Sequence, residues 1–339
     1  MMNRTPEHGG EALPADRPAS PIAVASIILS MTLVAIGNGL MFAYIPVRLG
    51  QAGFDPTWSG TMLTSLSSGS IAACLLTGWL VRRVGHARSL MVFSALIVLS
   101  NALVGAGTLP LPWIAARALY GFGITGIFIV AQAWLNDAVE NHVRGRVMAI
   151  MYVAYVVGLG LGSFTLRFLD LGTAAAPLVC IAFTALSILP IGLTRLRPPP
   201  PPASASVKLA QAWRISPVGI AGMMAAGGLG MMVSGFAPIH ATAIGYTQEQ
   251  VATLLFVMPL GTLLLQIPLG WISDRTDRRR VMIAAALLVA LAGVLATRID
   301  GSALVLVVLL YAIWAGAGGS FYSLSNAHAA DRAAKDELV

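Results

Sequence analysis

The stretch Gly270-Trp271-Ile272-Ser273-Asp274-Arg275-Thr276-Asp277-Arg278-Arg279-Arg280 separates one long apolar run from the next. An earlier stretch, Gly78-Trp79-Leu80-Val81-Arg82-Arg83-Val84-Gly85-His86-Ala87-Arg88, stands in the same position between two other apolar runs. In both, a Gly-Trp pair ends one run, and a short, strongly basic loop leads into the next. A basic loop between hydrophobic runs, present twice, predicts a membrane protein with several spans and two related halves.

The composition indicates that lipid is the main solvent of this chain. Hydrophobic residues make up 57% of the sequence and charged residues 10%, and the mean hydropathy is +0.80. Soluble domains carry roughly a quarter charged residues, so the charges here are too few to cover a surface that faces water. Lipid admits only helices or closed barrels, and continuous apolar runs of about twenty residues are typical of helices. We therefore expect an all-α polytopic membrane protein.

The basic residues predict the topology. The net charge is +7, and all of the 21 lysines and arginines except Arg48, Arg117, Arg167 and Arg298 fall on one side of the predicted membrane. Positively charged loops face the cytoplasm, and this rule explains the charge without a nucleic-acid partner. We expect a multi-pass protein of the bacterial inner membrane with both termini cytoplasmic.

Ten apolar runs are long enough to cross a bilayer as helices. They cover residues 22–46, 59–81, 90–108, 111–135, 147–167, 175–195, 216–240, 250–272, 281–297 and 302–327.

The spans fall into two unequal groups on either side of a proline-rich segment, which includes the run Pro198–Pro202. A polyproline stretch is a stiff spacer and predicts a linker between two bundles. The predicted units are a disordered cytoplasmic tail (1–20), an N-terminal six-helix bundle (21–195), a cytoplasmic linker (196–214), a C-terminal bundle of four spans (215–327) and a cytoplasmic tail or loop (328–339). We expect that two C-terminal helices are missing from a six-plus-six arrangement; a protein with ten natural spans is the alternative.

These features resemble the major facilitator superfamily (MFS) over the whole chain. The loop signature of that family is Gly-x-x-x-Asp-Arg followed by a basic cluster. Its second copy here comprises Gly270, Asp274, Arg275, Arg278, Arg279 and Arg280. Its first copy comprises Gly78, Arg83, Gly85 and Arg88, with Arg82 in place of the acid. The segment Ala133–Asp137 ahead of Arg144-Gly145-Arg146 is similar to the bacterial YcaD-like and sugar-transporter-like subgroup.

The resemblance implies that the two basic loops act as cytoplasmic contacts that hold one conformation of the transporter. Asp274 is then expected to face the start of the fifth span, near Arg144–Val147, because a helix N-terminus favours an anion. The cluster Arg278–Arg280 is expected to pair with Asp137 and Glu140. The alternative is that these arginines only determine topology.

Glycines in two regions are expected at close helix contacts. Gly270 opens the second basic loop, and Gly158 and Gly162 lie four residues apart in the fifth span. Small residues at this spacing allow helix backbones to approach each other in a membrane.

A second stretch, Arg117-Ala118-Leu119-Tyr120-Gly121-Phe122-Gly123, resembles the fourth-span motif of the family, where the matching arginine is implicated in proton coupling. Arginine at bilayer depth costs at least about 2.5–3.5 kcal/mol, so Arg117 is expected to face the bundle interior or a water-filled cavity. The alternative is an arginine that extends to the outer interface. Protons are therefore an expected partner. The middle of every predicted span lacks Asp and Glu. Three alternatives therefore remain open: Asp137 binds the proton, the proton-binding group lies in the missing helices, or the protein is a uniporter.

Polar and aromatic residues inside the spans are candidates for a solute cavity, which would suit a neutral or amphiphilic small molecule. Besides Arg117 they include Asn38, Gln132, Tyr152, Tyr155, Gln266, Tyr311 and Asn326.

The sequence has neither a Gly-x-x-x-x-Gly-Lys phosphate loop nor histidines and cysteines at metal-ligand spacing, so we expect no enzyme activity, ATP-driven transport, cofactor or metal. The predicted function is secondary active transport of a small solute, by symport or antiport, in a monomer that works by alternating access. The alternative is a non-transporting scaffold or sensor, or an inactive fragment of a transporter.

Overall fold

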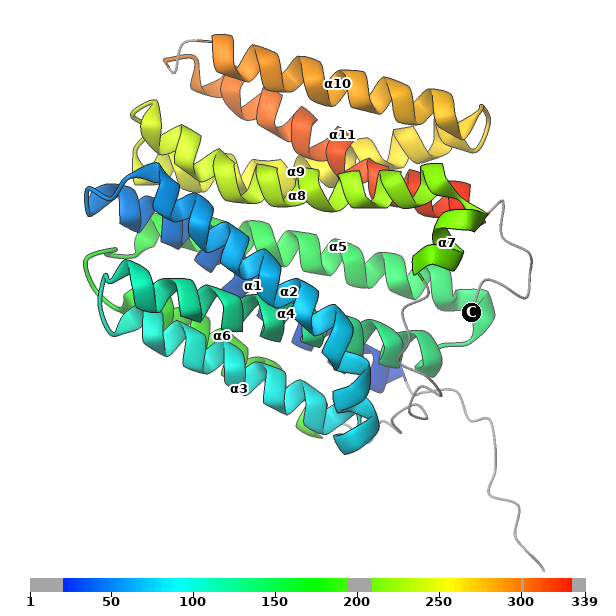
Figure 1. Cartoon of the computed structure of the whole chain (residues 1–339), viewed down its shortest axis with the longest axis horizontal. Coiled ribbons are helices and arrows are strands. Elements are labelled where there is room, and N and C mark those ends of the chain that lie inside the picture. Colours follow the sequence, from blue (N-terminus) through cyan, green and yellow to red (C-terminus); the bar gives the residue numbers. More distant parts are fainter. Residues whose placement is uncertain (1–20, 194–208, 300–301, 331–339) are drawn as a thin grey trace, which may run out of the picture.

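The computed structural model describes residues 21–193, 209–299 and 302–330, and they form a bundle of long helices (Figure 1). The elements in chain order are α1 (Pro21–Gln51), α2 (Pro56–Val84), α3 (His86–Gly105), α4 (Pro110–Ala138), α5 (Asn141–Thr165), the 3-10 turn η1 (Leu166–Phe168), α6 (Ala175–Leu193), α7 (Leu209–Ile215), α8 (Pro217–Ala243), α9 (Gln248–Ser273), α10 (Arg278–Arg298) and α11 (Leu304–Ala330). Within these ranges, 10 helices are long and apolar enough to cross a membrane. The predicted all-α polytopic fold is confirmed.

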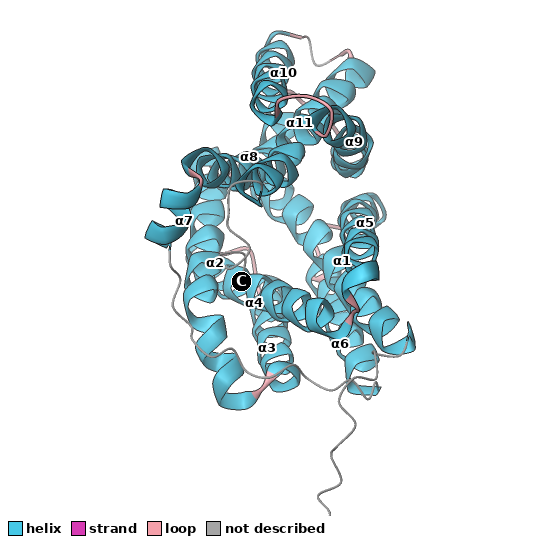
Figure 2. Cartoon of the chain, turned by 90° about the vertical axis from the view of Figure 1, so that its right-hand side faces the viewer, coloured by secondary structure: helices cyan, strands magenta, loops and turns pink. Residues whose placement is uncertain are grey.

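The helices pack as two groups, which Figure 2 shows one above the other. In the first group α1 packs against α5 and α6, and α4 packs against α2 and α3. In the second group α11 packs against α8, α9 and α10. We call the first group (α1 to α6) the N-bundle and the second (α8 to α11) the C-bundle. The short helix α7 contacts α8 and occupies the end of the predicted linker, whose earlier part lies outside the described residues, as does the predicted tail 1–20.

Several helices extend beyond their apolar runs into the basic segments. Helix α5 begins at Asn141 instead of residue 147, so Arg144 lies in its first turns instead of in a loop. Arg278 to Arg280 likewise form the first turn of α10, where Asp277 is the N-cap and its Oδ1 accepts a hydrogen bond from the Arg279 N–H at 2.9 Å. Long arginine side chains can reach water from a helix end, so the helix need not stop where the apolar run stops.

The connection between α2 and α3 is one residue, Gly85. Its φ of 83° lies in the left-handed region, which glycine adopts without the strain that a Cβ would add. The Gly85 N–H donates to the Val81 carbonyl at 2.8 Å, and the Gly85 carbonyl accepts from the Ser89 N–H at 3.1 Å. The first basic segment is therefore a tight corner between two helices and not a loop.

Glycines bring helix backbones together in equivalent places of the two bundles. A Cβ on Gly121 of α4 would collide with the Leu66 carbonyl of α2, and one on Gly261 of α9 would collide with the Ala312 carbonyl of α11. In each bundle the pair consists of the second and the fourth spanning helix. The prediction for α5 is also confirmed, because a Cβ on Gly162 would collide with the Ile36 carbonyl of α1. The prediction for Gly270 is wrong, since a Cβ there would meet no atom within 4 Å.

Candidate transport cavity and signature loops

The molecule has two ends that differ in charge. We call the end with the α2–α3 and α9–α10 connections the basic end. The opposite end, with the α1–α2 and α8–α9 connections, is called the distal end. Figure 2 views the molecule from the basic end.

A cavity of about 260 Å³ lies between the two bundles. Helices α1 and α5 line it from the N-bundle, and α8, α9 and α11 from the C-bundle. Its polar groups are the hydroxyls of Tyr152, Ser163, Ser234 and Thr262. The other lining residues are glycines, proline and apolar residues, namely Gly39, Phe42, Val156, Leu159, Leu229, Gly230, Val233, Leu255, Met258, Pro259, Ala315, Gly318 and Gly319. The lining is thus mostly apolar and uncharged, with a few hydroxyl groups. Sites of this kind orient a ligand through a small number of polar contacts.

The bundles contact each other through the distal third of their helices. The rings of Phe164 in α5 and Phe256 in α9 lie 5.2 Å apart between centroids. The Gln248 side chain at the start of α9 donates from Nε2 to the carbonyls of Leu166 at 2.6 Å and Leu169 at 2.9 Å. Next to it, the Arg167 guanidinium pairs with the Glu249 carboxylate. These apolar and polar contacts close the distal side of the cavity.

A buried polar cluster lies behind the cavity wall inside the N-bundle. Arg117 of α4 is 3% exposed, and its guanidinium carbon lies 4.8 Å from the Tyr120 ring centre and 5.6 Å from that of Phe42. Asn38 of α1 donates from Nδ2 to the Tyr155 hydroxyl of α5 at 3.2 Å. Arg117 therefore faces the interior and does not extend to the interface, as the first of the two sequence alternatives predicted.

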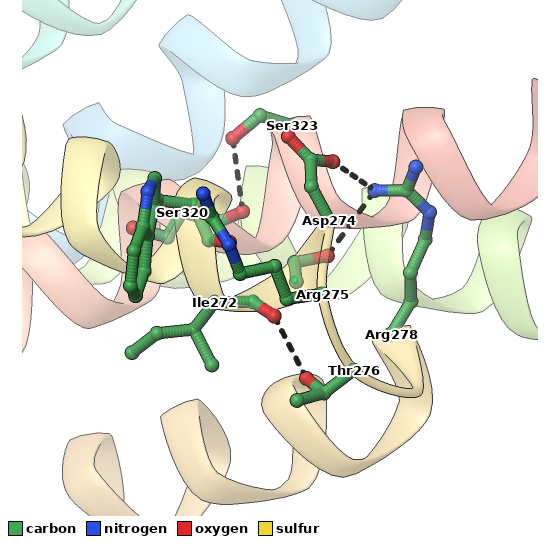
Figure 3. Close-up of polar contacts among 9 residues, drawn as sticks. Ile272, Asp274, Arg275, Thr276, Arg278, Ser320 and Ser323 are labelled. Carbon is green, nitrogen blue, oxygen red and sulfur yellow. Dashed lines mark hydrogen bonds and ion pairs between the residues drawn. The ribbon is translucent and has the colours of Figure 1, made fainter.

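The second signature loop is held together by its own charges (Figure 3). Arg278 donates from Nη1 to the Asp274 carboxylate at 3.1 Å and to the Ser273 hydroxyl at 3.2 Å. Arg275 places its guanidinium 3.8 Å from the centre of the Trp271 ring. The residue that caps a helix here is Asp277, which the sequence argument missed although an Asp just before a helix start is a common N-cap.

The expected contacts between this loop and the start of α5 are not formed in this conformation. Asp274 pairs with Arg278, four residues later in the first turn of α10, instead of with the α5 N-terminus. Glu140 pairs with His142 at 3.1 Å instead of with the arginines of α10, and Asp137 is exposed. The physical reason is that the bundles meet at the distal end, which leaves their basic ends free of these pairings.

The first signature copy repeats one contact of the second. The guanidinium of Arg83 lies 5.5 Å from the centre of the Trp79 ring, the same four-residue spacing as Arg275 on Trp271. Both tryptophans are largely exposed. Arginine over tryptophan is a favourable cation–π arrangement, and tryptophan prefers the membrane interface. Arg88 is exposed in the first turn of α3.

Of the polar candidates chosen from the sequence, Tyr152 lines the cavity. Tyr311 is buried within the C-bundle, where its hydroxyl lies 2.9 Å from Nδ1 of His240. Gln266 donates to the Ser323 hydroxyl at 3.5 Å, also within the C-bundle.

Two further candidates lie away from the cavity: Gln132 is half-buried on α4, and Asn326 is exposed near the basic end of α11. Phe42, Ser234 and Thr262 line the cavity and were not predicted from the sequence. Hydroxyl and aromatic residues are common in spans, so only the rotation of each helix reveals which of them face a cavity.

Sequence comparison with known proteins identifies the family of this chain. Residues 27–338 match the Major Facilitator Superfamily. The uncharacterised MFS-type transporter YcaD of Salmonella enteritidis is 24% identical over 322 residues, which cover 93% of this chain and 82% of that protein. YcaD of Salmonella typhi matches to the same extent.

Solved structures share the architecture at low sequence identity. The nucleoside transporter NupG has a TM-score of 0.73 at 12% identity, over 94% of this chain and 84% of that one. A D-xylose–proton symporter has a TM-score of 0.68 at 14% identity, over 90% of this chain and 82% of that one. At this identity the likeness establishes the fold. Because the family match spans most of the residues, the predicted resemblance is confirmed, and this chain belongs to the major facilitator superfamily of membrane transporters.

Proposed function

We propose that this protein is a secondary active transporter of a small solute in the bacterial inner membrane, working by alternating access as a monomer. The cavity between the two bundles is the single observation that carries the proposal. Both bundles line it, so a relative rotation of the bundles would change its access from one side of the membrane to the other. A scaffold or sensor needs no such cavity between its halves.

We place the basic end and both termini in the cytoplasm, because the lysines and arginines concentrate there. The closed distal end then faces the periplasm, and the described conformation is the inward-facing one. In the outward-facing state the contacts of Arg167, Gln248 and Phe164 with α9 separate. Asp274 then leaves Arg278 and faces the N-terminus of α5, where free N–H groups favour an anion.

We propose protons as the coupling ion, carried in symport or antiport. Asp137 is the proposed proton-binding group, because it is an exposed carboxylate at the basic end of α4, beside the basic loops. The fold shared with a D-xylose–proton symporter supports protons as the coupling ion, and Asp137 is chosen by its position.

The test is transport by the purified full chain in lipid vesicles. Vesicles with an acidic or an alkaline lumen are exposed to an isotope-labelled extract of bacterial metabolites, and mass spectrometry identifies solutes that accumulate relative to protein-free vesicles. We expect at least one solute to accumulate in response to the pH gradient and to show saturable counterflow. Accumulation that does not depend on the pH gradient would contradict proton coupling. Flux that does not saturate would indicate a pore, and the absence of any enriched solute would favour the scaffold.

A further inference from the structure

Arg117 is a buried cation for which the described residues supply no counter-ion. Its side chain is 3% exposed, and Nη1 has no hydrogen-bond partner among the described residues. The Phe42 and Tyr120 rings stabilise the guanidinium charge by cation–π contacts. This stabilisation is weaker than that from water or from a carboxylate. A guanidinium remains charged even when buried, so this position is unfavourable unless an anion can reach it.

The N-bundle offers no carboxylate for this purpose. In the ranges that the structure describes, every Asp and Glu lies at a helix end or in a connection between helices. These residues are Asp55, Asp137, Glu140, Asp170, Glu249, Asp274 and Asp277. Among these ranges Arg167 forms an ion pair with Glu249 and Arg278 forms one with Asp274, and Glu140 contacts the His142 ring. A counter-ion for Arg117 must therefore come from outside the bundle.

The cavity lies next to this cation, with one side chain between them. Phe42 lines the cavity, and its ring centre is 5.6 Å from the Arg117 guanidinium carbon. One helix turn earlier on α1, Asn38 has a buried Oδ1 that also lacks a hydrogen-bond partner. Its Nδ2 is bonded to Tyr155, whose neighbour Val156 lines the cavity. The unpartnered polar atoms thus lie directly behind the cavity wall that Phe42 forms.

We propose that the transported solute is an amphiphilic organic monoanion whose carboxylate pairs with Arg117. The Phe42 ring turns aside to admit the carboxylate, and the apolar part of the solute occupies the cavity between the bundles. A guanidinium binds a carboxylate through two parallel hydrogen bonds, which fixes the orientation of the solute. The apolar lining with its few hydroxyls suits the rest of such a molecule. The proposal rests on the proposed transport function and names its substrate class.

Binding is measured on the purified full chain as the rise in unfolding temperature with ligand concentration. The probes are linear and phenyl-substituted monocarboxylates of four to ten carbons, each paired with the neutral amide of the same carbon skeleton. At least one acid is expected to bind wild type on the order of tenfold more tightly than its amide, a difference expected for a charge-assisted bidentate pair. An equal response to every acid and its amide would overturn the proposal.

Four variants assign the selectivity to the site. Arg117→Gln should abolish the preference for the acid, and Arg117→Lys should retain part of it, because lysine keeps the charge but not the bidentate geometry. Arg298→Gln removes an exposed arginine at the end of α10 and should leave the preference unchanged. If Arg117→Gln fails to fold, Phe42→Ala decides: it should bind the acid roughly threefold more tightly, because no ring has to move. Unchanged acid binding in Phe42→Ala would contradict the proposed path.

The binding and transport measurements test the anion site and the transport function separately. Selective, Arg117-dependent binding without flux would leave the anion site in place and remove the transport function. Saturable flux of neutral solutes, unaffected in rate by competing acids, would keep the transport function and overturn the anion site.

Discussion

Arg167 of η1 forms an ion pair with Glu249 in the first turn of α9, and this pair joins the N-bundle to the C-bundle at the distal end. The guanidinium of Arg167 also lies 4.8 Å from the ring centre of Phe164, which in turn packs against Phe256 of α9. Charge and apolar contacts therefore meet at one point between the bundles, and a change of access requires that both separate.

Arg167→Ala should shift the molecule toward a conformation that is open at the distal end. The pair is partly exposed, so its contribution is at most about 1 kcal/mol, or up to about fivefold in the ratio of the two conformations. Spin labels on cysteines at the exposed positions 52 and 243, with the exposed Cys74 replaced by serine, report the separation of the two distal surfaces. Arg298→Ala should not change their distance distribution. Identical distributions for Arg167→Ala and wild type would show that the pair does not hold the bundles.

Asp274→Asn and Arg278→Gln should shift the same equilibrium in opposite directions. Loss of the Asp274 charge removes the proposed partner of α5 in the outward-facing state, so distal labels should come closer on average and transport should fall by about twofold or more. Loss of Arg278 releases Asp274 from its 3.1 Å pair and should move the labels apart. The amount of each variant in the membrane should match wild type. Shifts in the same direction would indicate that the loop acts only through its own ion pair.

Two glycine-to-alanine changes should have opposite outcomes. In Gly162→Ala the new Cβ collides with the Ile36 backbone of α1, and overpacking of this kind costs about 1–3 kcal/mol or more, so the unfolding temperature should drop. In Gly270→Ala the Cβ meets nothing within 4 Å, and alanine favours the helix by up to about 1 kcal/mol. A larger loss of stability in Gly270→Ala than in Gly162→Ala would contradict the packing described above.

Gly230→Leu should block the cavity without disturbing the fold. Gly230 lines the cavity, and a Cβ there has open space around it, so the leucine side chain should occupy volume meant for the solute. We expect flux into vesicles to fall several-fold at an unchanged unfolding temperature. Gly227→Leu, one turn away on α8 and equally free of neighbours but outside the cavity lining, is the matched control. Equal flux in the two variants would mean that the solute takes another path.

The N-cap of α2 predicts a dependence of stability on pH. Hydrogen bonds from the hydroxyl and backbone N–H of Thr57 lower the pKa of Asp55, which lies at the distal end outside the spans. A lowered pKa means that the charged carboxylate contributes stability above the usual Asp range, and that this contribution is lost as the pH falls through the folded pKa. Asp55→Ala should therefore unfold at a lower temperature than wild type at neutral pH, and the gap should close in acid. A gap that persists at a pH below the lowered, folded-state pKa of Asp55 would point to a cause other than this cap.

The number and kind of spanning helices could be predicted from the sequence because both depend on neighbouring residues. An apolar run of span length must become a helix in lipid, whatever lies beside it. The helix ends were predicted less well. The fifth span was predicted to begin at residue 147, where its apolar run starts, but α5 begins at Asn141, because capping and side-chain reach extend a helix past its apolar part.

The site is formed by contacts between residues far apart in the chain. Only the tertiary structure decided which residues make these contacts. Arg117 could extend to the interface or face inward, and the packing of α4 against α1 placed it behind Phe42. Gly270 matches a family signature yet touches nothing, whereas Gly162 meets the backbone of Ile36. Hydropathy, charge and span length are sums over adjacent residues, so the sequence by itself determined the class of protein and its basic end. The rotation of each helix, and hence the lining of the cavity, follows from packing against helices that are distant in the sequence, as Arg117 on Phe42 and Gly261 on Ala312 show.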